Sequence, residues 1–166
     1  MGSSAGAWPQ LGDVKVETLL GGKQQDMVVY SKEGSAVAVG EFKRPNKPVQ
    51  TDYKNAKEKA ESLGAPLFIT SNFNETIVWH VSGERLKSFG PIGVSSLEEF
   101  RDAQKKIALQ KLWKDVLDFV YAFTQQGLLA LTNLEQSRFY IRLITRKAKE
   151  LGPEFQKAFE LSLIHI

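Results

Sequence analysis

The sequence changes character near Pro91, and this change constrains the fold more than any other feature of the chain. Before Pro91, short runs rich in β-branched residues alternate with turns, and after it the pattern is almost entirely helical. Two of the runs, residues 26–30 and 36–42, flank a turn that contains Gly34, so they predict a β-hairpin. We therefore expect an α/β chain whose sheet occupies residues 13–90.

A helix and two more strands complete the predicted sheet. Residues 52–63 have helical spacing of apolar side chains, and Gly64 ends that pattern. Residues 66–70 form a nearly continuous apolar run, which is typical of a strand buried on both faces, and residues 76–81 form another strand. Because a strand–helix–strand crossover pairs its strands in parallel while a hairpin pairs them antiparallel, this order predicts a mixed β-sheet flanked by helices.

The segment before the hairpin has two interpretations. Val14 and Val16 alternate with polar residues as in a strand, whereas a short helix that enters at Trp8 is also compatible with residues 12–20. Both interpretations stay open on the sequence alone.

The C-terminal part predicts long helices. Ser96 is followed three residues later by Glu99, the signature of a capping box. Apolar residues then recur every three or four positions as far as Phe123, which indicates one long amphipathic helix ending near Gly127.

A second helix is expected over residues 134–151, closed by Gly152 and Pro153, and a short third helix after it. We expect two parts: a core over residues 1–90, and a helical region over residues 95–166 that serves as a connector or an extension that binds DNA.

Composition excludes several classes of site. The chain contains no cysteine, so a disulfide framework, a thiolate metal site and a cysteine nucleophile are excluded, and a cytoplasmic location is expected. No apolar run approaches the roughly 20 residues that a membrane span needs, so we expect no membrane contact. The formal net charge of +3 permits contact with phosphates and does not require it.

Glu41, Phe42 and Lys43 end the second strand of the hairpin and carry the clearest chemical pattern. Side chains alternate along a strand, so Glu41 and Lys43 lie on one face and Phe42 on the other. Asp26 begins the neighbouring strand, and neighbouring strands lie about 5 Å apart. Asp26 and Glu41 are therefore expected to share a face.

Two carboxylates that converge repel each other unless a cation lies between them. Magnesium prefers oxygen ligands, and Asp26, Glu41 and a main-chain carbonyl would suffice. Such an ion polarises a phosphate and lowers the pKa of a bound water, while Lys43 would orient or deprotonate that water or stabilise charge on phosphorus. The alternative is an ordinary surface charge pair, but a strand that looks buried argues for a specific role.

These residues resemble a known family. The segment from Gly22 to Asp26, the run Glu41-Phe42-Lys43-Arg44-Pro45, and the strand ending near Trp79 are similar to the PD-(D/E)xK nuclease core at the N-terminus of type I restriction enzyme R subunits and their relatives. The resemblance covers roughly residues 21–81. It implies a restriction-endonuclease-like fold in which Asp26 and Glu41 bind Mg²⁺, with Mn²⁺ able to substitute, and Lys43 is catalytic.

The function that the resemblance implies is Mg²⁺-dependent cleavage of double-stranded DNA, as the nuclease part of a restriction-modification enzyme. Methyltransferase, motor and specificity parts would then lie outside this chain. Two alternatives remain: a nuclease-fold module that binds DNA or protein without cutting, and a repair or recombination nuclease such as a junction resolvase.

The chain departs from the family pattern on the predicted helix. Many relatives carry a glutamine and a tyrosine four residues apart there, where this chain has Asn55 and Lys59. Gln50 and Tyr53 lie just upstream and are candidates to substitute. Relatives also take an acidic residue from an N-terminal helix, and Glu17 is the candidate here.

Basic residues form two groups that we expect to contact the DNA backbone, with solvated charge as the alternative interpretation. One group surrounds the predicted site, and the other follows three- and four-residue steps along the second C-terminal helix. The residues are Arg44, Lys47 and Lys54 in the first group, and Arg138, Arg142 and Arg146 in the second.

Overall fold

The computed structural model describes residues 11–20, 23–126, 133–150 and 152. The chain forms two compact units, Met1–Ala130 and Leu131–Ile166. The expected helix entry at Trp8, the helix end near Gly127 and the third C-terminal helix lie outside the described residues.

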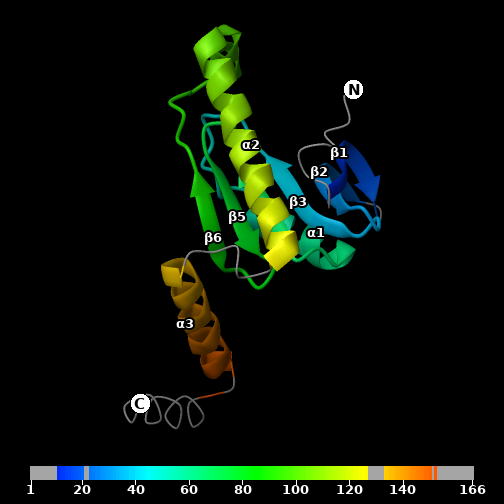
Figure 1. Ribbon diagram of the computed structural model, residues 1–166. Coiled ribbons are helices and arrows are strands. Elements are labelled where there is room, and N and C mark those ends of the chain that lie inside the picture. Colours follow the sequence, from blue (N-terminus) through cyan, green and yellow to red (C-terminus); the bar gives the residue numbers. More distant parts are fainter. Residues whose placement is uncertain (1–10, 21–22, 127–132, 151, 153–166) are drawn as a thin grey trace. The chain divides into compact units, whose positions relative to one another are not determined.

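A six-stranded sheet forms the centre of the first unit, with the strands side by side in chain order. β3 and β4 are parallel and every other neighbouring pair is antiparallel, so the predicted mixed sheet and α/β class are confirmed (Figure 1). The strands are β1 (Leu11–Leu20), β2 (Lys23–Ser31), β3 (Ala36–Phe42), β4 (Leu67–Ser71), β5 (Thr76–His80) and β6 (Arg85–Phe89).

Two helices cover the two faces of this sheet (Figure 1). α1 (Tyr53–Leu63) links the parallel strands β3 and β4 and packs Ala56 and Ala60 into a core with Val39. α2 (Ala103–Gln126) lies on the other face, where the ring of Trp113 is 5.3 Å from the ring of Phe42. The central strands are apolar at consecutive positions because both of their faces are buried.

A local signal sets the C-terminal end of α1. Gly64 has φ = 68°, a left-handed conformation that glycine adopts without a steric penalty. Its backbone N–H donates to the carbonyl of Glu61, and that of Ala65 donates to the carbonyl of Ala60 at 2.9 Å. The predicted helix end at Gly64 is therefore confirmed.

The sheet also contains two strands that the sequence left open or missed. Residues 11–20 form the strand β1, so the alternative of a helix there is wrong. β6 follows the turn at Gly83, which has φ = 101°, and only Leu86 of this strand is buried. The backbone hydrogen-bond partners of β6 are in β5. The apolar pattern of the β6 sequence does not indicate this pairing.

The predicted long helix is divided at Asp102. The capping signal is confirmed, since the carboxylate of Glu99 accepts the backbone N–H of Ser96, but it starts a short 3-10 helix, η1 (Leu97–Arg101). Asp102 has extended backbone angles and its Oδ1 accepts the backbone N–H groups of Gln104 and Lys105, so it begins α2. The prediction of one continuous helix is wrong.

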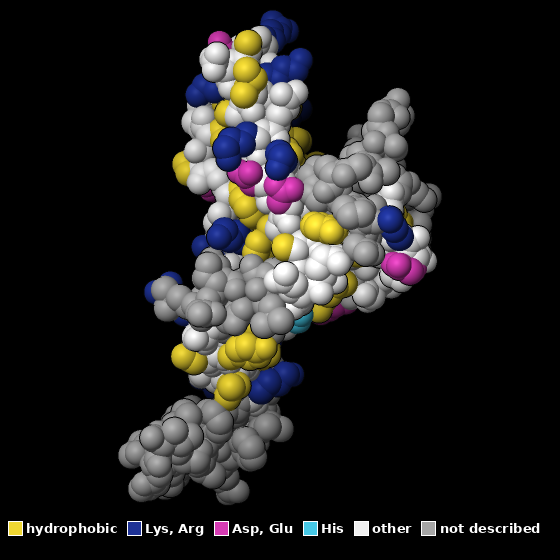
Figure 2. Space-filling view, in the orientation of Figure 1, with side chains coloured by type: hydrophobic (Ala, Val, Ile, Leu, Met, Phe, Trp, Pro, Cys, Tyr) yellow, Lys and Arg dark blue, Asp and Glu magenta, His cyan; other side chains and the backbone are white. Residues whose placement is uncertain are grey.

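The exposed side of α2 carries basic and acidic side chains next to one another (Figure 2). Lys111 pairs with Asp115, and Lys114 pairs with Asp118, each at 2.6 Å and four residues apart. Ion pairs of this kind are typical of a solvated helix surface.

The second unit contains α3 (Asn133–Glu150), followed by Gly152 with φ = 99°. The second predicted C-terminal helix is thus present. None of the described helices has the length and apolar character needed to cross a membrane.

Candidate active site

The end of β3 brings together the two carboxylates predicted from the sequence. Met27 of β2 pairs with Gly40 of β3 in antiparallel register, so Asp26 stands opposite Glu41. Residues opposite each other in an antiparallel pair point to the same face of the sheet. The backbone N–H of Phe42 donates to Asp26 Oδ2 at 2.7 Å, which fixes the aspartate beside the strand end.

The carboxylate of Glu41 is held by α1. Its Oε2 accepts a hydrogen bond from Asn55 Nδ2 at 3.2 Å, and its Oε1 forms an ion pair with Lys59 Nζ. Only 5% of the Glu41 side chain and 8% of the Lys59 side chain are exposed. A buried carboxylate is costly without such partners, and Asn55 and Lys59 reach it together because they lie four residues apart on one helix face.

Lys43 follows β3 and forms its own ion pair. Its Nζ lies 2.6 Å from Asp52 Oδ2, just before α1 begins, and 40% of the lysine side chain is exposed. The hydrogen bond to Asp52 raises the pKa of Lys43, and the charges of Asp26 and Glu41 act in the same direction. Lys43 is therefore protonated at neutral pH and suits charge stabilisation rather than proton abstraction.

Glu41 has a shifted pKa as well. Burial raises the pKa of its carboxyl group, the hydrogen bond from Lys59 opposes that rise, and the charge of Asp26 adds to it. The ion pair with Lys59 is what favours the charged carboxylate in this position.

A row of acidic residues crosses three neighbouring strands at this point. In β1, Val16 pairs with Met27 and Thr18 pairs with Gln25, so Glu17 occupies the register position opposite Asp26. The expected acidic residue therefore comes from a strand rather than from an N-terminal helix, but at a position next to Asp26.

The oxygen donors of Asp26 and Glu41 fit a hard divalent cation in chemistry, and such an ion would compete with the present partners of Glu41. Both of its oxygens are engaged by Lys59 and Asn55, and the positive charge beside it is the ammonium of Lys59. Among the described residues, no group of three or more acidic or histidine side chains could hold a metal ion.

Gln50 and Tyr53, the candidates to replace the missing glutamine and tyrosine, are not brought to Glu41. Tyr53 belongs to the core: its ring centre lies 4.8 Å from that of Trp79, and its hydroxyl donates to the carbonyl of Gly83 at 3.1 Å. Gln50 is exposed and lines a different hollow of about 260 Å³. Asn55 and Lys59, which mark the departure from the family pattern, are the helix residues that reach the site.

The basic residues near the site are exposed. Arg44 and Lys47 follow Lys43 in a loop that is tied down by a hydrogen bond from Asn72 Nδ2 to the carbonyl of Lys47, at 2.8 Å. Lys54 is 91% exposed and lies 3.9 Å from Glu58. Their side chains are accessible to a phosphate backbone, and DNA contact stays a prediction for them.

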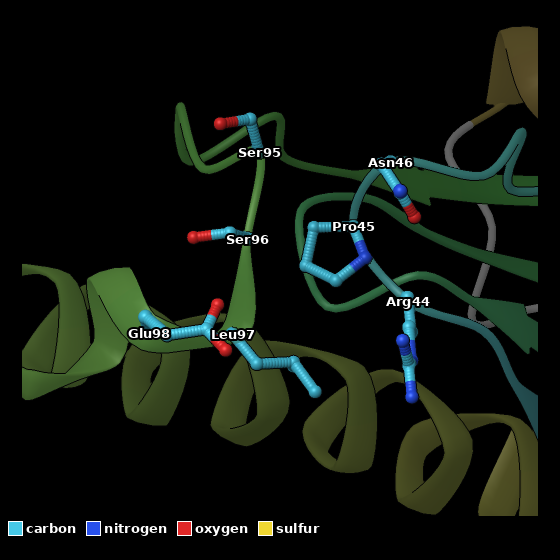
Figure 3. A pocket seen from close by; sticks show the side chains of 7 residues that line it. All are labelled: Arg44, Pro45, Asn46, Ser95, Ser96, Leu97 and Glu98. Carbon is cyan, nitrogen blue, oxygen red and sulfur yellow. The ribbon is translucent and has the colours of Figure 1, made fainter.

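A pocket of about 220 Å³ lies beside this loop. Figure 3 shows that the hydroxyl groups of Ser95 and Ser96 point away from the guanidinium of Arg44, and the carboxylate of Glu98 is on the serine side of the pocket. The polar groups therefore do not converge on a common point, and the pocket is a surface hollow rather than a built ligand site.

The second basic group belongs to the second unit. Arg138 and Arg142 of α3 are exposed and Arg146 is half-buried, and the Nε of Arg142 donates to the carbonyl of Arg138 at 3.2 Å. Their contact with DNA also stays a prediction.

Sequence reasoning missed the partners of the two key side chains. Asp52 and Lys59 were not expected to pair with Lys43 and Glu41. One signal for the Lys59 contact was present in the sequence. Lys59 lies next to Ala60 and four residues after Asn55, in a helix whose alanines pack on the sheet. Asn55 and Lys59 therefore border the buried face of the helix.

Comparisons with known proteins find similarity only among solved structures. Neither a protein-family model nor a curated protein matches the chain. A fragment assigned to the HsdR subunit of a type I restriction enzyme from Vibrio vulnificus YJ016 is 22% identical with a TM-score of 0.37, over 57% of this chain. The type IIG restriction endonuclease BpuSI is 14% identical with a TM-score of 0.48, over 70% of this chain.

The first neighbour is a fragment of a restriction-enzyme subunit, and the second is a restriction endonuclease. The aligned regions cover only 16% and 15% of the two longer chains. At these scores the likeness does not decide the chemistry of the site.

Proposed function

We propose that this chain is the nuclease part of a restriction-modification enzyme and cleaves double-stranded DNA with Mg²⁺. The observation that carries the proposal is the convergence of Asp26 and Glu41 at the ends of two paired strands, with Lys43 following on the same strand end. Motor, methyltransferase and specificity functions belong to parts outside this chain in this proposal.

The residues would have distinct roles. Mg²⁺, when bound between carboxylates, supplies charge for the scissile phosphate and acidifies a bound water. Lys43 is protonated, so its ammonium group would stabilise negative charge on phosphate oxygens. The phosphate would compete with Asp52 for this ammonium group. Arg44 and Lys47 hold the backbone by contacts that weaken with salt.

The proposal is tested by incubating supercoiled and linear plasmid DNA with the protein and either Mg²⁺ or Mn²⁺. Glu41→Gln and Lys43→Met are expected to lower the cleavage rate by about 100-fold or more, as removal of a charge-stabilising group does. Lys32→Met and Glu33→Gln, which change exposed residues of the β2–β3 turn, serve as matched controls. Absence of cleavage by the folded wild type with both ions would refute the proposal.

A second candidate is a nuclease-fold module that binds DNA or protein without cutting. The pairing of Lys59 with Glu41 favours it, because a protein cation already balances the carboxylate. This candidate predicts salt-sensitive DNA binding that is unchanged by Mg²⁺ and by Glu41→Gln. The plasmid assay and a binding assay at several salt concentrations separate the two functions.

A further inference from the structure

The ammonium group of Lys59 is fixed at the carboxylate of Glu41 by the packing of α1. Ala56 and Ala60, which flank Lys59 on the helix, have no exposed surface and pack against Val39 of β3. The helix backbone therefore cannot withdraw without breaking the core. Lys59 can leave Glu41 only by rotation of its own four-carbon side chain.

A divalent ion and Lys59 would compete for this carboxylate. Asn55 occupies one oxygen of Glu41 and Lys59 occupies the other. Two cations at neighbouring positions repel strongly where water is excluded, and the Glu41 and Lys59 side chains are both almost completely buried. Asp26 contributes a second carboxylate beside Glu41. Among the described residues, the hydrogen bond to Asp26 reaches its Oδ2 and not its Oδ1.

We propose that Lys59 is an internal counter-ion that occupies the cation position at Glu41, so that a divalent metal ion binds there only after Lys59 has left. Lys59 thereby controls the metal affinity of the site and holds Glu41 in place while no metal is bound. The inference deepens the proposed function, since it concerns the metal that this function requires. It is tested by metal binding alone, so either idea can fail without the other.

The experiment measures Mn²⁺ binding to the complete chain without DNA, by isothermal titration calorimetry and by the loss of the free-ion signal in electron paramagnetic resonance. Lys59→Met keeps most of the length of the side chain and removes its charge. Lys57→Met is the matched control, because Lys57 lies on the same helix and pairs with Glu61 at 3.6 Å instead of with Glu41. We expect the Mn²⁺ affinity to rise at least about tenfold in Lys59→Met and to stay unchanged in Lys57→Met.

Two further variants keep the result decisive. Lys59→Gln retains a hydrogen-bond donor for Glu41, so it replaces Lys59→Met if circular dichroism shows that the methionine variant is unfolded. Asp26→Asn in the Lys59→Met background is expected to abolish the gain in affinity, which locates the ion between the two carboxylates.

The Mn²⁺-binding results test the role of Lys59 separately from DNA cleavage. Mn²⁺ affinity at or below the wild-type value in the folded Lys59 variants overturns the proposal, whatever the plasmid assay shows. A gain that persists with Asp26→Asn also overturns it, because the ion then binds elsewhere. A gain that depends on Asp26, in a protein that does not cleave DNA, supports the proposal and removes the nuclease function.

Discussion

The ion pair between Glu41 and Lys59 predicts a strongly non-additive response of stability to mutation. Lys59→Met leaves the Glu41 carboxylate with Asn55 as its remaining partner among the described residues, and Glu41→Met removes the carboxylate that pairs with the buried ammonium group of Lys59. Breaking a buried pair from one side costs about 3–5 kcal/mol, because the remaining charge stays out of water. Removing both partners with apolar residues of similar size is often nearly neutral.

These magnitudes suit a measurement by urea unfolding. Single domains are stable by about 5–15 kcal/mol, so both single variants are expected to fold with much of their stability lost. Because Asn55 still donates a hydrogen bond to Glu41, we expect the stability loss of Lys59→Met to lie at the lower end of this range. We expect a double-mutant cycle to give a coupling free energy of about 2–3 kcal/mol.

The control cycle uses the pair of Lys57 and Glu61 on the exposed side of the same helix. Their charged atoms are 3.6 Å apart and their side chains are 32% and 53% exposed. Pairs of this kind contribute about 0.5 kcal/mol or less. Equal coupling in the two cycles, or additivity at Glu41 and Lys59, would refute the claim that burial makes this pair different.

The pH dependence supplies an independent check. Burial raises the pKa of Glu41 above its usual value of 4.5, and Lys59 restrains that rise. Removing Lys59 raises the pKa of Glu41 further. A group whose pKa is higher in the folded state contributes stability that is fully present below its unfolded pKa and is lost as pH rises through its folded pKa. The penalty of Lys59→Met is therefore expected to shrink as pH falls from 7 towards 4.5, and a constant penalty contradicts the assignment.

Two further predictions concern the end of β6 and the start of α2, and both are measured by urea unfolding. Gly90→Ala is expected to cost about 2 kcal/mol or more, because Gly90 has φ = 89° and an added Cβ would lie 2.5 Å from the carbonyl oxygen of Asn74. A loss below about 0.5 kcal/mol would contradict this steric argument. Asp102→Ala removes the acceptor for two N–H groups at the start of α2 and is expected to cost about 1 kcal/mol, whereas Asp102→Asn should retain most of the stability. Equal losses in the two variants of Asp102 would show that the cap is not the cause.

The central sheet was predictable because its signals are local and strong. β3 and β4 are continuous apolar runs, since α1 and α2 bury both faces of the sheet, and Gly64 ends α1 by a conformation that its sequence favours. β6 was not predictable in the same way. It lies at the edge of the sheet and buries only Leu86, so its structure depends on pairing with β5 rather than on its own pattern.

The break before α2 shows how a local hydrogen bond overrides periodicity. The apolar residues recur at helical spacing across Asp102, which favours one helix. The Asp102 carboxylate instead accepts two backbone N–H groups of the following turn, which requires extended backbone angles at Asp102 itself. An aspartate within an apparently continuous helix was the available signal.

Strand register determines one part of the candidate site, the pair of Asp26 and Glu41. Tertiary packing determines the other part, the contact of Lys59 with Glu41. Asp26 and Glu41 face each other because the hairpin turn and a register irregularity between Val29 and Tyr30 together set the pairing of β2 and β3. Lys59 reaches Glu41 across 18 residues, and only the docking angle of α1 decides whether its side chain meets the carboxylate or water. A sequence without a known docking angle cannot distinguish these two outcomes.

Charge balance connects the two lysines of the site with the two ligands that the proposed function requires. Lys43 is paired with Asp52 and Lys59 with Glu41, so each protein cation is already matched by a carboxylate. A DNA phosphate brings negative charge that competes with Asp52 for the partly exposed Lys43, and a divalent ion brings positive charge that competes with Lys59 for Glu41. Each ligand therefore lowers the cost of admitting the other, and this coupling is reciprocal. DNA affinity measured with Ca²⁺ is expected to exceed that without a divalent ion in the wild type, and much of this gain should disappear in Glu41→Gln; equal affinities with and without Ca²⁺ would contradict the exchange.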